Sequence, residues 1–299
     1  MGETRLAVLD YFVVDVFSAS ALEGNQLAVV MNTVGFTTLQ MQAIAREFNL
    51  SETTFVERRA PEVERAEGVR VRIFTPREEL NFAGHPTLGT ANVLRISAPS
   101  TLAGDTVTLR LNVGPVPVKF SADGTLGEMI QPDPTFGETL DPAKVTELTG
   151  LDAADLDPAL PPAIVSTGTA FAIVVLSSAA SLARISVRTQ EATSWLRERG
   201  ARWFFVLGPT GATEPDYRAR MQFNGGEDPA TGSAAGCAIA WLVHRGAVAP
   251  GRRIHLRQGV EIARPSDLFL SAEMQSGRVY SVRVAGSTVL VAKGQLFLP

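Results

Sequence analysis

Hydrophobic positions along the chain fall mostly into short runs that are typical of strands. Residues 6–17 are rich in valine and aromatic residues, and residues 27–30 are uniformly apolar, so both segments predict strands. Apolar positions then recur at helical spacing over residues 37–48, and residues 51–56 predict the next strand. The chain therefore begins with the predicted order strand, strand, helix, strand.

The same order returns about half the chain length further on. Residues 171–175 predict a strand, residues 189–199 a helix and residues 203–207 a strand. The segment 121–142 is rich in glycine, proline and aspartate and predicts a linker. We therefore expect two similar domains, residues 1–126 and 127–299. Further strands are predicted at residues 253–257, 260–263, 267–273, 279–284 and 288–292.

One motif, Pro-x-x-Gly-[Ser/Thr]-Ala, occurs at residues 86–91 and again at 229–234, and an apolar segment follows each copy. Proline suits the first position of a helix, so each copy predicts a helix that begins at its proline. The second helix, residues 231–242, is apolar nearly all round and should be buried. The predicted fold class is α+β, with two pseudo-symmetric halves that each wrap a curved, barrel-like, mostly antiparallel sheet around one central helix.

Each copy of the motif is preceded by a residue that can exchange a proton, His85 in the first and Asp228 in the second. The N-terminus of a helix carries the positive end of its dipole and N–H groups without intrahelical partners. Two such ends could hold a small anion between them. A purely structural role remains open, because His85 could cap its helix and aspartate before a first-turn proline is a common N-cap.

Glu52 is the third candidate for acid–base chemistry. It begins the predicted strand 51–56, where alternation places Glu52, Thr54 and Val56 on one face. A carboxyl group in a partly apolar site has a raised pKa, which suits proton transfer near neutral pH. An ordinary surface role for Glu52 remains the alternative.

Two glycine–hydroxyl pairs occupy matching places in the two motifs, Gly89 with Thr90 and Gly232 with Ser233. Glycine would let a ligand approach the backbone closely. Neither motif matches a phosphate-binding or dinucleotide-binding loop. The histidines show no metal-ligand spacing, so we expect no metal. Cys237 lies in an apolar run and is expected to be a small buried residue.

Composition narrows the class of protein further. The net charge of −4 over 299 residues gives no support for binding to nucleic acid or to an anionic membrane. A single cysteine excludes internal disulfides and cysteine-cluster metal sites. Acidic residues interrupt the N-terminal apolar run, unlike a signal peptide, and no apolar stretch is long enough to span a membrane. We expect a soluble cytoplasmic protein.

Four blocks of sequence together resemble one known family, the PhzF-like phenazine-biosynthesis proteins. They come in the family's order, span residues 15–236 and cover nearly the whole chain. The blocks are Asp15-Val16-Phe17 with Gly24-Asn25, Ser51-Glu52-Thr53-Thr54-Phe55-Val56, residues 74–89 ending in Gly84-His85-Pro86-Thr87-Leu88-Gly89, and Glu227-Asp228-Pro229-Ala230-Thr231-Gly232-Ser233-Ala234.

This resemblance implies a diaminopimelate epimerase-like fold in which the last strand returns to the first domain. It also implies a cofactor-independent isomerase, usually a homodimer, that acts on a small carboxylic or amino acid. Matched motif by motif, Glu52 is the residue that moves the proton, and His85, Asp228 and Ser233 support it. The neighbouring motif residues are expected to bind substrate: Ser51, Gly84, Thr87, Gly89, Thr90 and Gly232.

The chain departs from the family pattern in two places. Gln26 stands where the family usually has proline, and the segment 220–226 is short and lacks the usual proline–glycine loop. The expected activity is a proton and double-bond shift in bacterial secondary metabolism, of antibiotic or phenazine type. Two alternatives stay open, a non-catalytic or amino-acid-binding protein on the same fold and an epimerase with acid–base groups other than thiols.

Overall fold

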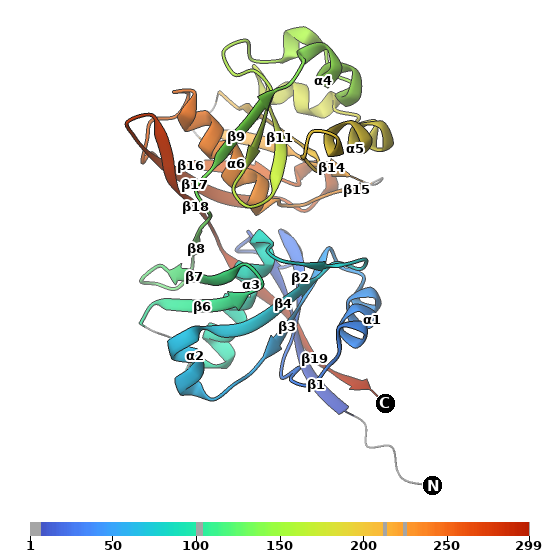
Figure 1. Cartoon of the computed structure of the whole chain (residues 1–299), viewed down its shortest axis with the longest axis vertical. Coiled ribbons are helices and arrows are strands. Elements are labelled where there is room, and N and C mark those ends of the chain that lie inside the picture. The colour runs from blue at the N-terminus through green and yellow to red at the C-terminus, as the bar shows by residue number, and fades with distance from the viewer. Residues whose placement is uncertain (1–6, 100–103, 212–213, 224–225, 299) are drawn as a thin grey trace. The chain divides into compact units, whose positions relative to one another are not determined.

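The computed structural model describes residues 7–99, 104–211, 214–223 and 226–298, so residue 6 of the first predicted strand lies outside the described residues. The chain divides into two compact units (Figure 1). Unit 1 consists of the chain up to Met129 together with the C-terminal segment that begins at Gly286, and unit 2 spans Ile130–Ala285. The passage from one unit to the other therefore occurs inside the segment predicted as a linker.

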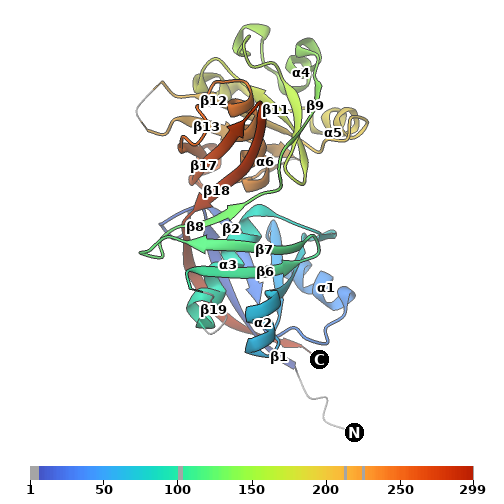
Figure 2. The ribbon, with the colours of Figure 1, turned by 60° about the vertical axis from the view of Figure 1, so that its left-hand side comes forward.

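Unit 1 is built on one curved sheet that wraps helix α3 (Gly84–Ser97) (Figure 2). Two shorter helices, α1 (Thr38–Phe48) and α2 (Pro61–Glu67), lie against the sheet. In order of hydrogen-bonded neighbours the strands are β19 (Thr288–Leu298), β1 (Ala7–Val16), β2 (Asn25–Val30), β3 (Glu52–Glu57), β4 (Val69–Phe74) with the short β5 (Glu79–Leu80), β6 (Thr106–Leu111), β7 (Gly114–Phe120) and β8 (Gly127–Ile130).

Unit 2 has the same construction around helix α6 (Gly232–His244), with helices α4 (Pro142–Thr149) and α5 (Thr189–Arg197) outside it. Its strands, again in order of neighbours, are β9 (Thr135–Thr139), β10 (Ala163–Ser166), β11 (Ala170–Val175), β12 (Phe204–Pro209), β13 (Tyr217–Arg220), β16 (Ile254–Gln258), β17 (Ser266–Gln275) and β18 (Arg278–Gly286). The short strands β14 (Gln222–Phe223) and β15 (Gly226–Glu227) pair antiparallel as a separate two-stranded sheet.

Strand pairing repeats between the two units, which confirms the predicted pseudo-symmetric fold. From β1 to β8 the successive pairs are antiparallel, parallel, antiparallel, parallel, antiparallel and antiparallel. The series from β10 to β18 has the same sequence of directions. In both central helices the residues of the first turns and the middle are buried, apart from the half-buried Ser233, as expected for a helix surrounded by its sheet.

Local signals explain several boundaries. Helix α1 begins where the Thr37 hydroxyl accepts a hydrogen bond from the backbone of Gln40, while the Gln40 side chain accepts one from the Thr37 backbone. It ends at Asn49, which adopts a left-handed conformation with φ of 50°. This cap turns the chain directly into β3 and so determines where Glu52 lies.

Four sequence-based expectations need correction. The predicted linker contains two strands, β8 and β9. The glycine–proline pair Gly114-Pro115 predicts the turn of a hairpin between residues 107–113 and 116–120, but the β6–β7 hairpin turns at residues 112–113, and both residues already belong to β7. Residues 260–262 form a 3-10 turn instead of a strand, because the flanking Gly259 and Ala263 both have positive φ. Neither central helix begins at its motif proline, since α3 starts before Pro86 and α6 starts after Pro229.

Within the described ranges, no helix combines the length and the hydrophobicity required to cross a membrane.

Candidate active site

Glu52 is the first residue of β3, opposite Leu27 of β2 in a parallel pair. Its side chain is 17% exposed, so the carboxylate is largely withdrawn from water. The predicted alternation holds on this face of β3, because Glu52 and Thr54 both point toward α3 and meet His85 and Thr90 there. Glu52 is therefore a half-buried carboxylate facing the central helix.

His85 is the second residue of α3, and its Nε2 lies 3.4 Å from Oε2 of Glu52. The residue is only 5% exposed. Burial lowers the pKa of the imidazole to about 3, while a hydrogen bond with the backbone of Gln26 acts in the opposite direction. The imidazole is thus neutral at physiological pH, and its contact with Glu52 is not an ion pair.

Asn25 also contacts this imidazole. Its side-chain amide nitrogen lies 3.3 Å from Nδ1 of His85, and the tautomer of the ring decides which of the two groups donates. The sequence marked Asn25 as a motif residue but gave no sign that it contacts His85, which is 60 residues away.

Two features restrain the loop before Asn25. The buried carboxylate of Asp15 accepts a hydrogen bond of 2.7 Å from the backbone of Leu22. Gly24 has a φ of +69°, and a side-chain carbon there would lie 2.4 Å from the backbone oxygen of Val16. Asp15 and Gly24 of the first motif block therefore hold Asn25 at the start of β2.

The other unit 1 motif residues take part in helix packing. Thr90 is buried and its hydroxyl lies 2.8 Å from that of Thr54, and the Thr87 hydroxyl donates to the Ala83 carbonyl at 2.7 Å. A side-chain carbon at Gly89 would lie 2.6 Å from Leu27, so packing against β2 requires this glycine. Gly84 is the first residue of α3 and Ser51 is exposed just before β3.

In unit 2, Asp228 lies between β15 and α6 and is 9% exposed. It is not the N-cap of α6, a position taken by Thr231. Instead, Oδ2 of Asp228 accepts a hydrogen bond of 2.6 Å from the Thr231 hydroxyl. Gly232 begins α6, and Ser233 follows it with a half-buried side chain. Unit 2 thus holds Asp228, Gly232 and Ser233 together at one helix start.

The sequence matches a family described as "Phenazine biosynthesis-like protein" over residues 14–294. The chain belongs to this phenazine biosynthesis-like family. An isomerase of Mesorhizobium japonicum is 36% identical to this chain, and the aligned region covers 97% of this chain and 99% of that protein. The trans-2,3-dihydro-3-hydroxyanthranilate isomerase of Pseudomonas aeruginosa is 33% identical over 96% of this chain and 99% of its own. As a member of this family, the protein is an isomerase.

The fold agrees with this assignment. A phenazine biosynthesis protein of the PhzF family from Bacillus anthracis superposes with a TM-score of 0.85, at 24% identity, over 97% of this chain and 99% of the other. This isomerase therefore has the diaminopimelate epimerase-like fold that its sequence predicted. Residues 224–225 of its shortened segment 220–226 lie outside the described residues.

The single cysteine of this isomerase is unsuited to proton transfer. Cys237 is fully buried on α6, with its sulfur 3.4 Å from the Thr167 hydroxyl and 3.6 Å from the Thr169 carbonyl. Burial raises the pKa of its thiol to about 11.

In the part of the chain that the structure describes, no three histidine, cysteine or acidic side chains are grouped to hold a metal ion.

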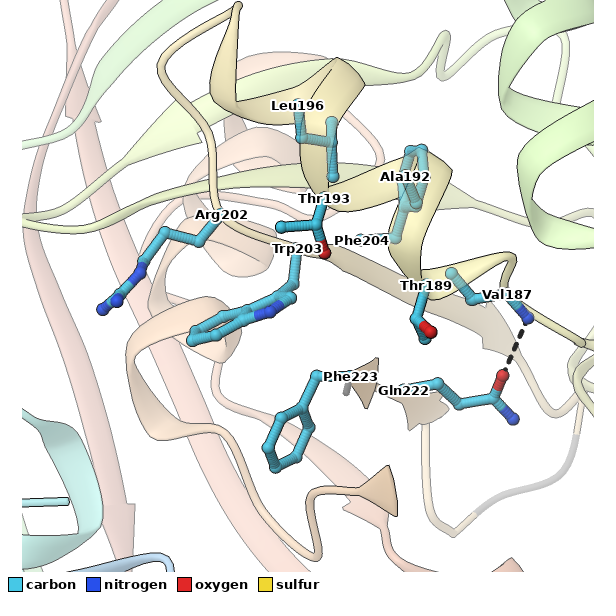
Figure 3. Close-up of a pocket in the computed structure, with 10 residues that line it drawn as sticks. All are labelled: Val187, Thr189, Ala192, Thr193, Leu196, Arg202, Trp203, Phe204, Gln222 and Phe223. Carbon is cyan, nitrogen blue, oxygen red and sulfur yellow. Dashed lines mark hydrogen bonds between the residues drawn. The ribbon is translucent and has the colours of Figure 1, made fainter. Parts of the chain in front are cut away.

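A shallow pocket, partly open to solvent, lies in unit 2 beside α5 (Figure 3). The rings of Trp203 and Phe223 border it with centroids 5.8 Å apart, and the Gln222 carboxamide accepts a hydrogen bond from the Val187 backbone at its rim. None of the predicted site residues lines this pocket. It is separate from the Glu52–His85 contact, which belongs to unit 1.

Proposed function

We propose that this isomerase moves one proton within a small, conjugated, cyclic carboxylic or amino acid, and that Glu52 is its general acid and base. The observation that supports this assignment is the half-buried Glu52 carboxylate 3.4 Å from a buried, neutral imidazole. A carboxyl group that carries a proton needs a site that excludes most water, and its neighbour must not hold it in a permanent ion pair. His85 meets the second need because its burial disfavours the imidazolium.

In the proposed reaction, Glu52 removes a proton from one carbon, and the electron pair of that C–H bond enters the conjugated system as a dienolate. The protonated Glu52 then donates to a second carbon on the same face, forming a new C–H bond and shifting the double bond. No other group gains or loses a proton overall. The carbon skeleton of the substrate stays unchanged, and the step as written uses no cofactor.

The charge that builds up on the dienolate needs stabilisation. The N-termini of α3 and α6 supply positive dipole ends, which stabilise developing negative charge when they are fixed in advance. We assign His85, Asp228 and Ser233 to hold the polar groups of the substrate, with the backbone at Gly84 and Gly232 beside them. The N–H of Thr231 is not available for this, since it donates to the side chain of Gln258.

The substrate class follows from a relative. The Pseudomonas aeruginosa protein is named for trans-2,3-dihydro-3-hydroxyanthranilate, a small cyclic amino acid with conjugated double bonds. We propose a substrate of the same chemical class for this protein, in bacterial secondary metabolism of antibiotic or phenazine type. A homodimer in the cytoplasm remains part of the proposal.

The test is Glu52→Gln, which keeps size and hydrogen bonding but cannot carry the proton. Turnover is measured on trans-2,3-dihydro-3-hydroxyanthranilate and on a panel of related cyclic dienoic amino acids. We expect kcat to fall by about 10²–10⁴-fold, the range typical of general acid–base catalysis. The matched control is Glu57→Gln at the other end of β3, where Glu57 lies 3.9 Å from Arg70, and it should leave turnover unchanged.

A Glu52→Gln enzyme that works as fast as the natural protein would refute the role of Glu52. A natural protein that turns over no acid in the panel, although it is folded, would refute the substrate class.

A further inference from the structure

Gln258 joins the end of β16 to the turn that contains Asp228. This carboxamide is fully buried, and it makes three hydrogen bonds to residues 228–231. Its Oε1 accepts from the Thr231 backbone N–H at 3.0 Å, and its Nε2 donates to the Asp228 carbonyl at 2.8 Å and to the Thr231 hydroxyl at 3.1 Å. All polar atoms of the amide are therefore engaged by one four-residue turn.

These contacts also determine the direction of the next hydrogen bond. The orientation of the Gln258 amide is fixed, because a backbone N–H requires its oxygen and a backbone carbonyl requires its nitrogen. The Thr231 hydroxyl accepts from Gln258, so its own proton is free to point at Oδ2 of Asp228, 2.6 Å away. The competing acceptor, Sδ of Met221 at 3.4 Å, is weak. A chain of donors thus runs from Gln258 through Thr231 to Asp228.

The backbone next to Gln258 brings the turn and β16 into direct contact. Gly259 has a φ of +77°, and a side-chain carbon there would lie 2.6 Å from the Pro229 carbonyl oxygen and 2.3 Å from that of Arg264. The turn therefore rests on the end of a strand, with no room for a side chain between them. An aspartate supported in this way has little freedom to change its direction.

We propose that Gln258 and Thr231 are positioning residues that aim the Asp228 carboxylate at the substrate. This inference rests on the proposed function, in which Asp228 holds a polar group of the substrate. Neither residue needs to touch the substrate, since each acts through Asp228. Loss of the Thr231 hydroxyl would leave Asp228 chemically unchanged but remove the hydrogen bond that orients Oδ2. Misplacement of a catalytic group by about 1 Å can lower the rate about 10²-fold.

The experiment compares Thr231→Val, Thr231→Ser, Asp228→Asn and the double variant Thr231→Val/Asp228→Asn. Turnover is measured on whichever acid of the panel the natural protein converts, and binding of 3-hydroxyanthranilate is measured by calorimetry. Thr231→Val should lower kcat about 10–100-fold, and Thr231→Ser should restore most of it. In the Asp228→Asn background, Thr231→Val should lower kcat by less than about threefold, because the two residues act as one unit.

Thr149→Val is the matched control for the loss of a buried threonine hydroxyl. Thr149 is also in unit 2 and fully buried, and its hydroxyl donates only within α4, to the Val145 carbonyl at 2.7 Å. It should lower the melting temperature about as much as Thr231→Val, with kcat unchanged. Crystal structures of both valine variants give a readout that does not depend on turnover, since only Thr231→Val should show Asp228 in more than one rotamer.

Each outcome separates the two proposals. If Thr231→Val keeps full turnover while Asp228→Asn loses it, the positioning role is wrong and the proposed function stands. Full activity of Asp228→Asn refutes the role of Asp228 itself. If no acid of the panel is converted, the proposed function fails, and an unaltered Asp228 rotamer in Thr231→Val would overturn the positioning role as well.

Discussion

The two copies of the repeated motif fold differently although their sequences match. In unit 1 the helix begins at Gly84, so His85 and Pro86 lie inside its first turn. In unit 2 the helix begins only at Gly232, and Asp228 with Pro229 stays in a separate turn. In unit 2 the residues before the helix make other hydrogen bonds, because Gln258 accepts from the Thr231 N–H and Asp228 accepts from the Thr231 hydroxyl.

A second asymmetry lies on the strands beside the central helices. Leu27 of β2 stands opposite Glu52, and the corresponding position in unit 2 pairs Ala172 with Phe204. Unit 1 thus has a carboxylate and a neutral imidazole where unit 2 has a buried phenylalanine and a hydrogen-bonded aspartate. The repeat preserves strand order and helix position, while substitution at a few equivalent places gives each unit different chemistry.

The largest expected effect concerns the buried imidazole of unit 1. The pKa of His85 is about 3 in the folded protein and near 6.5 in the unfolded chain. Between these values the unfolded chain binds a proton that the folded protein does not, so the free energy of unfolding should fall as the pH falls. From pH 6.5 to pH 4 the loss is up to about 3 kcal/mol. Urea unfolding at several pH values measures it, and His85→Asn should flatten the dependence.

His255 in unit 2 provides the opposite case. Hydrogen bonds to Asp267, at 2.6 Å, and to Glu214 raise the pKa of its imidazole despite partial burial. Its stabilising contribution is therefore complete below pH 6.5 and is lost as the pH rises through the folded pKa. His255→Gln should remove a decline in stability on the alkaline side. Equal pH dependence in both histidine variants would contradict the contrast between the two sites.

The next effect concerns the close contact under the Asp228 turn. Gly259→Ala should destabilise the protein by about 3 kcal/mol, from the positive φ and from collision with the Pro229 and Arg264 carbonyls. Gly246→Ala is the control, because Gly246 has nearly the same φ, +75°, with no atom within 4 Å of the added carbon. It should cost about 1 kcal/mol. Thermal unfolding compares the two, and equal losses would mean that the turn does not rest on β16.

Patterns that depend on neighbouring residues were predictable from the sequence. The alternation around Glu52 placed its side chain on the face that meets α3, and the apolar composition of α6 predicted its burial. The motif resemblance also indicated the fold and the isomerase family, which the family match and the relatives confirm. The roles of Glu52, His85 and Asp228 stay predictions.

Contacts between distant segments were not predictable. Asn25 contacts a histidine 60 residues away, and Gln258 contacts a threonine 27 residues away. Nothing in the sequence around either carboxamide reveals its partner. The residues before α6 also depend on a distant partner, since the backbone N–H of Thr231 donates to the side chain of Gln258. Local patterns predicted the central helices, and the contacts that surround the start of α6 come from another strand.

The smallest effect is expected at Cys237, which tests whether either unit uses a thiol. Its thiol pKa of about 11 leaves on the order of one molecule in a thousand as thiolate at pH 8. Cys237→Ala should change stability by no more than about 1 kcal/mol and leave turnover unchanged, and a thiol reagent should label the folded protein only slowly. Loss of turnover in this variant, with the fold intact by circular dichroism, would shift the proton chemistry from the Glu52 carboxylate of unit 1 to the thiol of unit 2. It would then favour an epimerase over the proposed proton shift.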